Sequence, residues 1–174
     1  MEDKIKKKNW IKELLPYIII LILVIIIKQF VITPVMVDGT SMYPTLEDGD
    51  IMILNRLKYK FSDIKRFDIV VIHDHNTYII KRVIGLPGDK VEYINDKLYI
   101  NGKKVKEKFS HALTEDYNIG SLGKTKVPKN QYFVVGDNRI NSLDSRTIGF
   151  IPKDEILGHT SLTIIPFSRF GNKK

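Results

Sequence analysis

The chain has 174 residues, no cysteine and a formal net charge of +8, a length that fits one modest domain with an appendage. The lack of cysteine excludes disulfides, thiolate zinc sites and a cysteine nucleophile. The charge permits binding to nucleic acid, anionic lipid or acidic substrates, but the sequence has no basic stripe with interleaved aromatic residues, so nucleic acid is not expected as a partner.

The N-terminus combines a lysine-rich segment, residues 1–13, with the most apolar run of the sequence, residues 18–27. The span 14–33 has about the length of a tilted membrane helix, which needs ~20 residues. A cleaved signal peptide would need a small-residue cleavage site after this run, and residues 30–34 offer none; a buried core strand would be shorter. We therefore expect an uncleaved transmembrane signal-anchor helix, with the basic segment in the cytoplasm and residues 34–174 outside it.

Short apolar stretches separated by turn residues dominate the chain from Pro34 onward. Asn95-Asp96 and Asn101-Gly102 are typical of tight hairpin turns, and Leu86-Pro87-Gly88-Asp89 is typical of a type II turn. Residues 106–130 are polar and weakly patterned, which indicates a long loop or an irregular hairpin. This pattern predicts a mainly β domain, an antiparallel barrel or sandwich, with strands at 51–54, 68–72, 78–84, 91–94, 97–100, 131–135, 148–151 and 162–165.

Ser41 lies in a turn that contains Gly39 and Pro44 and follows the apolar run. Taken alone, a serine in such a turn is far more often structural than catalytic. A catalytic interpretation therefore needs a base elsewhere in the sequence.

Lys81 is one candidate for that base, because it shares a strand face with Ile79 and Val83. Burial would disfavour its ammonium form, and a neutral lysine can take a proton from a serine hydroxyl. The alternation does not decide whether the side chain is buried or reaches solvent, since Ile80 and Ile84 make the opposite face apolar as well.

His73 and His75 offer a rival interpretation, because residues two apart at a strand end face the same way. A zinc site needs three or four ligands, and the sequence places no further ligand beside them. A Ser-His-Asp triad using one of them is also conceivable. It would leave Lys81 and the polar segment 136–146 without a role.

Taken together, these stretches resemble one family, the type I signal peptidases, which are membrane-anchored serine proteases that cut signal peptides from exported proteins. The resemblance extends from the apolar N-terminal run to about Pro166 and is closest to the compact enzymes of Gram-positive bacteria. The motifs that carry it are Gly39-x-Ser41-Met42-x-Pro44-Thr45-Leu46, Lys81-Arg82-Val83-Ile84-Gly85-Leu86-Pro87-Gly88-Asp89, and Gly136-Asp137-Asn138-Arg139 followed by Asn141-Ser142-x-Asp144-Ser145-Arg146.

This resemblance implies a Ser-Lys dyad that works through an acyl-enzyme, with Ser41 as nucleophile and Lys81 as general base, and without metal or cofactor. It implies that Ser142 orients the lysine and that Asp144 and Arg146 form an ion pair behind the site. Asp137 and Asn138 belong to the same supporting group.

The oxyanion hole is the least determined part of the resemblance. One donor would be the backbone N–H of Ser41. Some relatives place a serine two residues before the nucleophile as the second donor, and this chain has Gly39 there, so a Gly39 backbone N–H or an ordered water would have to serve. Residues 103–130 look like a reduced version of the extra domain that longer relatives carry.

The function implied is that of a membrane-bound serine endopeptidase that cleaves N-terminal signal peptides, with small residues at −1 and −3, from exported preproteins. Its expected partners are these signal peptides and the lipid bilayer, close to the protein-export translocon. The candidates for contact with the bilayer are Met36, Met42, Tyr43, Phe167 and Phe170, joined by Arg169, Lys173 and Lys174.

Two other functions compete with this one. A self-cleaving relative would be a soluble protein with a cleavable segment, as in repressor-type autoproteases, and the apolar N-terminal run argues against it. An anchored module that binds exported peptides without cutting them would not need both Ser41 and Lys81.

Overall fold

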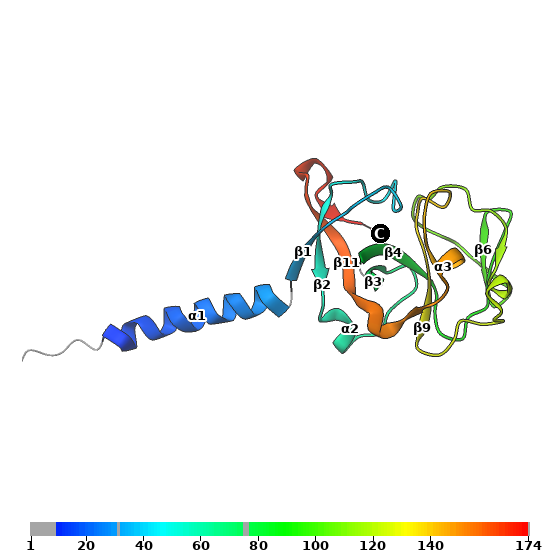
Figure 1. Ribbon diagram of the computed structural model, residues 1–174. Helices are drawn as coiled ribbons and strands as arrows, with labels where there is room; N and C mark the ends of the chain where they lie inside the picture. Colours follow the sequence, from blue (N-terminus) through cyan, green and yellow to red (C-terminus); the bar gives the residue numbers. More distant parts are fainter. Residues whose placement is uncertain (1–9, 31, 75–76, 174) are drawn as a thin grey trace, which may run out of the picture.

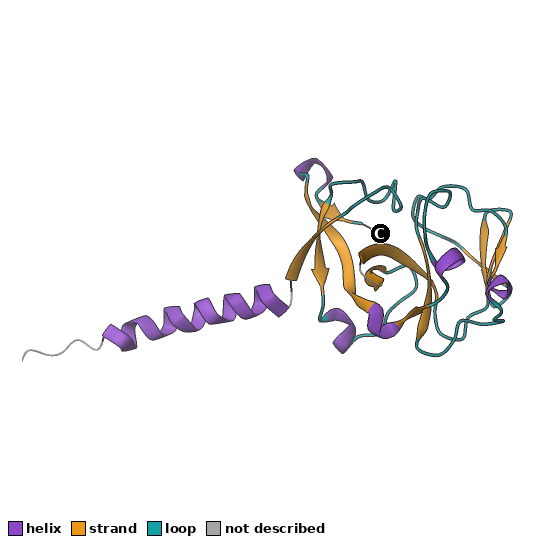
Figure 2. Ribbon diagram, in the orientation of Figure 1, coloured by secondary structure: helices purple, strands orange, loops and turns teal. Residues whose placement is uncertain are grey.

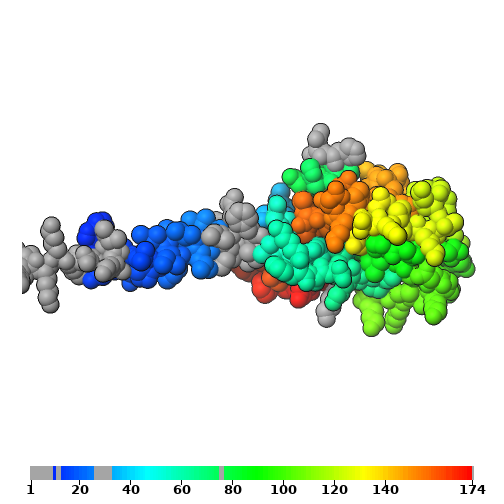
Figure 3. All heavy atoms as spheres, turned by 90° about the horizontal axis from the view of Figure 1, so that it is seen from below, coloured from blue at the N-terminus to red at the C-terminus, as the bar shows by residue number. Residues whose placement is uncertain are grey.

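The computed structural model describes residues 10–30, 32–74 and 77–173. Helix α1 (Trp10–Phe30) projects from a domain of antiparallel strands (Figure 1, Figure 3). Its side chains from Leu14 to Ile25 are apolar and exposed. Among the described residues, no helix combines the length and the apolar character needed to cross a membrane. The helix begins before the expected span 14–33 and ends at Phe30, and Ile32 already belongs to the first strand.

The larger sheet has eight strands in the order β1-β2-β11-β3-β4-β9-β10, with β12 paired to β11, and each of these pairings is antiparallel. The mainly β, antiparallel prediction is therefore confirmed. Within the described residues β1 and β10 do not pair with each other, so the sheet is open and the barrel, one of the two predicted forms, is not closed. The strands are β1 (Ile32–Met36), β2 (Ile51–Asn55), β3 (Ile69–Asp74), β4 (Thr77–Gly85), β9 (Gln131–Val135), β10 (Ile151–Pro152), β11 (Ile156–Ile165) and β12 (Gly171–Asn172).

A smaller sheet lies at the end of the domain that is remote from α1 (Figure 2). It has the order β7-β6-β5-β8. Asn95 and Asp96 both have positive φ, 49° and 59°, which is the conformation of a two-residue type I′ hairpin turn and confirms the predicted hairpin. The strands are β5 (Val91–Ile94), β6 (Lys97–Ile100), β7 (Lys103–Val105) and β8 (Tyr117–Asn118).

Short helices fill several connections. The strand predicted at 148–151 is largely wrong, because Asp144 accepts a hydrogen bond from the Arg146 amide (3.2 Å) and begins a helical turn there. Ile151 alone of that span lies in a strand, the two-residue β10. The helices are α2 (Lys58–Phe61), α3 (Ser145–Ile148) and the 3₁₀ turns η1 (Ile119–Leu122), η2 (Lys153–Glu155) and η3 (Phe167–Arg169).

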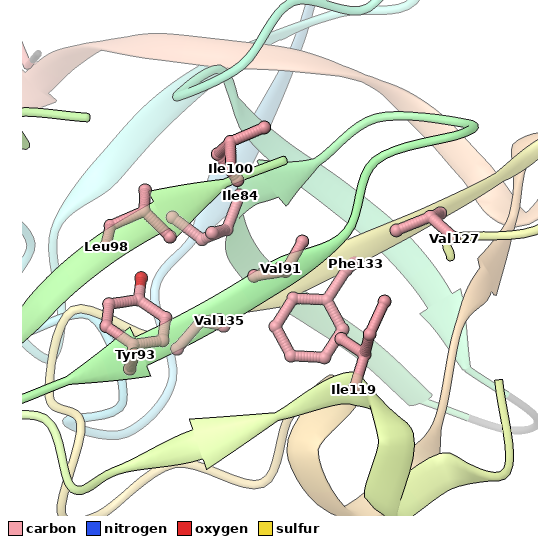
Figure 4. Packing of buried hydrophobic residues seen from close by; sticks show 9 residues of the cluster. All are labelled: Ile84, Val91, Tyr93, Leu98, Ile100, Ile119, Val127, Phe133 and Val135. Carbon is pink, nitrogen blue, oxygen red and sulfur yellow. The ribbon is translucent and has the colours of Figure 1, made fainter. Parts of the chain in front are cut away.

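One hydrophobic core joins the two sheets (Figure 4). Ile84, Phe133 and Val135 come from the larger sheet, and the smaller sheet contributes Val91, Tyr93, Leu98 and Ile100. Ile119 and Val127, from the predicted insertion 103–130, are also buried in this core. The segment is therefore packed into the domain, and burying its apolar side chains stabilises the junction of the sheets.

Candidate active site

The turn that carries Ser41 is anchored by its apolar neighbours. Met42 and Leu46 are buried in a cluster with Val37 and with residues of β2 and β3, and the Leu46 amide donates to the Met42 carbonyl (2.9 Å). Ser41 itself remains partly accessible. Burial on both sides of the serine thus fixes the backbone while leaving the hydroxyl available to a ligand.

Lys81 is brought to this turn by strand β4, where it pairs with Val70 of β3. Its side chain is buried, with 3% of the residue exposed. The Nζ atom donates a hydrogen bond to Ser41 Oγ at 2.6 Å. A base and a hydroxyl at this distance can exchange a proton directly.

The burial of Lys81 makes its ammonium form less stable than it would be in water. Burial lowers its pKa from the ordinary 10.5 to about 8, against the opposing effects of the Asp144 and Asp137 carboxylates, and with a smaller lowering by Arg146. Desolvation thus outweighs the nearby negative charges. Near neutral pH a useful fraction of the amine is unprotonated and can accept the serine proton.

Asp137 makes no hydrogen bond to Ser41 or Lys81 within the described residues, but it joins strand β4, which carries Lys81, to the turn that carries Ser41. Its carboxylate accepts two hydrogen bonds from Arg82, from Nε (2.8 Å) and Nη2 (2.6 Å), and both side chains are buried. Thr45, in the Ser41 turn, donates to the same carboxylate. This buried cluster therefore ties β4, the end of β9 and the Ser41 turn together.

Asn138 holds the Ser41 turn directly. Its backbone amide donates to the Ser41 carbonyl (3.0 Å), and its side-chain amide donates to the Thr40 carbonyl (3.1 Å). The two bonds orient the peptide groups on either side of the serine.

Asp144 lies behind the pair and is saturated with donors. Arg146 donates to it from Nε (2.9 Å) and Nη2 (2.8 Å), and the Gly136 amide donates at 3.0 Å. Burial opposes ionisation of Asp144, but these hydrogen bonds outweigh it and hold its pKa below the ordinary value. Asp144 therefore stays ionised, and its bond to the Gly136 amide fixes the start of the loop 136–146.

Ser142 packs against the same glycine. A Cβ atom added to Gly136 would lie 2.2 Å from Ser142 Oγ and 2.4 Å from the Ser41 carbonyl oxygen, so Ser142 and Ser41 approach Gly136 closely. The Ser142 hydroxyl is buried and makes no hydrogen bond of ordinary geometry within the described part of the chain, but it lies close enough to the Asp144 carboxylate to help lower the pKa of that group. The expected hydrogen bond to Lys81 is not formed in this structure, and the orienting role of Ser142 stays a prediction.

The Gly39 amide, one of the two candidates for the second oxyanion donor, already has an acceptor in this structure. The φ of Gly39 is +84°, and its amide donates to the Asp48 carboxylate at 2.7 Å. This N–H is therefore engaged and is not free to bind an oxyanion. The Ser41 amide has no hydrogen-bond acceptor among the backbone groups of the described residues, which leaves it as the available donor.

A cavity of about 330 Å³ opens beside the pair. Its walls are mostly apolar and come from β1, β2, β3, β4, β11 and the Ser41 turn, with Arg56 and Asp38 as charged groups in addition to Lys81. None of the described residues that line it comes from residues 103–146. The cavity therefore offers an apolar site for a ligand that reaches Ser41, separate from the loop that supports the dyad.

The described residues give no support to the rival histidine site. His73 is exposed at the end of β3 and lies against the Tyr78 ring, with 5.1 Å between centroids. His75 lies outside the described residues. In the described ranges, no group of three metal-ligating side chains comes together, and the hydroxyl of Ser41 is bonded to Lys81.

Two supporting residues were not assigned a role from the sequence, Arg82 and Thr45. The sequence does indicate that Arg82 needs a partner, because a charged residue that shares a strand face with apolar residues must be paired when it is buried. Its partner, 55 positions away in the sequence, could not be named without the fold.

Several known proteins match this chain. Residues 7–165 fit the family model described as signal peptidase, peptidase S26. Signal peptidase I of Bacillus caldolyticus is 42% identical, over 89% of this chain and 91% of its own. Signal peptidase I S of Bacillus subtilis is 40% identical, over 96% and 95%. A crystal structure of a signal peptidase I from Enterococcus faecalis superposes with a TM-score of 0.52 and 34% identity, over 56% of this chain and 97% of that one.

Proposed function

The chain belongs to the signal peptidase family, peptidase S26, and is a serine peptidase of that family; from this premise we propose that it removes N-terminal signal peptides from exported preproteins with a Ser41–Lys81 dyad. The observation that carries the proposal is the 2.6 Å contact between Lys81 Nζ and Ser41 Oγ. The burial of the lysine, which lowers its pKa to about 8, adds to it.

In the acylation step, neutral Lys81 takes the Ser41 proton while Oγ attacks the scissile carbonyl carbon. The ammonium then gives that proton to the nitrogen of the leaving mature protein, and the C–N bond breaks. The signal peptide remains as an ester on Ser41. Water, deprotonated by Lys81, hydrolyses this ester and restores both side chains.

The tetrahedral oxyanion needs donors that are already in place. The Ser41 amide is our candidate for the first, because it has no backbone partner in the part of the chain that the structure describes and lies on a turn fixed by Asn138. The Gly39 amide is bound to Asp48. An ordered water is the remaining candidate for the second.

The cavity beside the dyad fits a peptide better than a compact metabolite. β1 is the edge strand of the larger sheet, and its residues form one wall of the cavity. An extended substrate segment can add to such an edge through main-chain hydrogen bonds. Apolar walls of limited volume favour small side chains near the scissile bond, as the resemblance implies for positions −1 and −3.

We further propose that α1 inserts into the lipid bilayer and that the β domain works at its outer surface, near the export translocon. Exposed apolar side chains cover the described part of α1, and such a surface is costly in water. Met36, Tyr43, Phe167 and Phe170 are exposed as a bilayer contact requires, but Met42 is buried. Arg169 is paired with Asp50 and Glu47, so it is not available to lipid.

The test is cleavage of a purified preprotein by the full chain in detergent or lipid. Ser41→Ala and Lys81→Ala should each abolish processing, whereas His73→Ala should process at the wild-type rate. Wild-type turnover by either of the first two variants would refute the dyad. Activity in a Lys81→His variant would instead favour an imidazole base.

A further inference from the structure

A second buried ion pair joins the loop that supports the dyad to the segment 103–130. Glu107 and Arg139 meet through Oε1 and Nη2 at 2.6 Å, with 5% and 1% of their side chains exposed. Tyr93, in the core between the sheets (Figure 4), donates its hydroxyl to the same glutamate oxygen at 3.0 Å. Glu107 belongs to the segment 103–130, which none of the family's motifs in this chain includes.

The arginine of this pair belongs to the loop that supports the dyad, residues 136–146, which we call the catalytic loop. Arg139 Nε donates to the Gly136 carbonyl (3.1 Å), and Nη1 donates to Thr114 Oγ1 (2.6 Å). One guanidinium nitrogen of Arg139 thus donates to the catalytic loop, and the other two donate to the segment 103–130. A planar, rigid donor of this kind fixes its acceptors in one geometry.

Gly136 is the point at which this geometry matters. Its carbonyl is held by Arg139, its amide is held by Asp144 (3.0 Å), and its Cα faces the Ser41 carbonyl and Ser142. Movement of the Gly136 peptide would therefore be transmitted to the backbone of the nucleophile. Misplacement of reacting groups by about 1 Å can cost ~100-fold in rate.

The segment 103–130 makes two further contacts with the same region. The Phe109 ring lies 3.8 Å from the Arg82 guanidinium carbon and 5.9 Å from that of Arg139. The Ala112 amide donates to the Asp137 carbonyl at 2.9 Å. The glutamate is thus one part of a continuous contact between this segment and the catalytic loop.

We propose that Glu107 is a positioning residue, which fixes Arg139 and through it the Gly136 peptide, so that Ser41 is held in line for attack; this inference rests on the proposed function. Glu107 touches neither the dyad nor the cavity. Its loss should therefore lower kcat and leave KM nearly unchanged, because the cavity is lined by other parts of the chain.

The experiment compares Glu107→Gln with Glu92→Gln in preprotein cleavage, each measured well below its unfolding temperature. Glu92 lies in β5 of the smaller sheet, next to Tyr93, and pairs with Lys90, so its variant loses the same charge without touching Arg139. We expect kcat to fall about 10- to 100-fold in Glu107→Gln with KM within about twofold, and both constants to stay at wild-type values in Glu92→Gln. Unchanged kcat in folded Glu107→Gln overturns the proposal, as does a fall that Glu92→Gln shares.

A second variant decides the matter if Glu107→Gln does not fold. Thr114→Val keeps the shape of the side chain and removes one acceptor of Arg139, so kcat should fall by a smaller factor with KM unchanged. A Thr114→Val enzyme with wild-type kcat would overturn the positioning role. Failure of the wild-type chain to cleave preproteins would instead count against the proposed function, so the two failures are distinguishable.

Discussion

Lys81 and Arg82 are neighbours in β4, yet their side chains serve different partners on opposite faces of the sheet. Lys81 reaches Ser41 Oγ at 2.6 Å, and Arg82 reaches Asp137 through two hydrogen bonds. The alternation of side chains along a strand produces this division. One strand therefore carries both the proposed base and the main attachment of the catalytic loop, and substitutions at the two positions should have different effects.

Removing one partner of the Arg82–Asp137 pair should unfold the protein more readily. Asp137→Asn leaves a guanidinium in a buried site without its counter-charge, and breaking such a pair typically costs roughly 3–5 kcal/mol. The measurement is the free energy of unfolding from urea denaturation of the detergent-solubilised protein. Glu92→Gln, which breaks the more exposed pair with Lys90, should cost less than about 1 kcal/mol. Equal losses in the two variants would contradict this assignment.

The pH dependence of cleavage should report the titration of Lys81. Its neutral form is the active base, so kcat/KM should rise about tenfold per pH unit below pH 8 and level off above the pKa of about 8. A peptide substrate without ionisable groups near the scissile bond isolates the enzyme's titration. A rise in kcat/KM centred near pH ~6.5 would point to a histidine base. A kcat/KM that does not change with pH would show that Lys81 does not act as a base in the rate-determining step.

Ser142 offers a way to separate reactivity from stability. Its hydroxyl is buried and makes no hydrogen bond of ordinary geometry in the described structure, although it lies near the Asp144 carboxylate, so Ser142→Ala should change the free energy of unfolding by less than about 1 kcal/mol. If the hydroxyl orients Lys81 during the reaction, kcat should still fall about tenfold or more. Full activity in this variant would exclude the orienting role.

The matched control for Ser142→Ala is Ser145→Ala. The Ser145 hydroxyl accepts a hydrogen bond from the buried Val134 amide at 3.0 Å. Its removal leaves that amide without a partner, which should cost about 1–3 kcal/mol in unfolding free energy. Loss of stability in the Ser142 variant and not in the Ser145 variant would reverse our interpretation of both residues.

The parts of the fold that depend on neighbours in sequence could be predicted from the chain. The Asn95–Asp96 hairpin needs only two residues that tolerate positive φ. The turn at residues 86–89 has Gly88 at φ +88° and a hydrogen bond from the Asp89 amide to the Leu86 carbonyl. Ser41 and Lys81 could be singled out because their motifs occur together with that of the catalytic loop.

The parts that depend on long-range partners could not be predicted. The Gly39 amide was a candidate oxyanion donor until the fold brought Asp48 to it. The role of Glu107 depends on the packing of the segment 103–130 against the loop that contains Arg139. No local pattern encodes which distant strands pair or whether their sheet closes. The choice between a barrel and a sandwich could therefore not be made from the sequence.

Replacing the base by an apolar side chain should stabilise the protein while it abolishes cleavage. The pKa of Lys81 is about 8 in the folded protein and 10.5 in its ordinary environment. Below pH 8 the amine is protonated in both states, and the folded state carries the full cost of a buried ammonium. Between pH 8 and 10.5 the folded state loses the proton first, so this cost declines as the pH rises and disappears above that range.

Lys81→Met should therefore raise the free energy of unfolding at pH 7 by up to about 3 kcal/mol, since each pKa unit corresponds to ~1.4 kcal/mol. The gain should shrink as the pH approaches 10.5. Urea denaturation of both proteins at pH 7 and pH 10 measures it, with Lys90→Met, at an exposed position, as the control that should change little at either pH. A Lys81→Met protein that is less stable than the wild type at pH 7 would show that the fold stabilises the ammonium and does not lower the pKa of the lysine, and the general-base mechanism would then lose its physical basis.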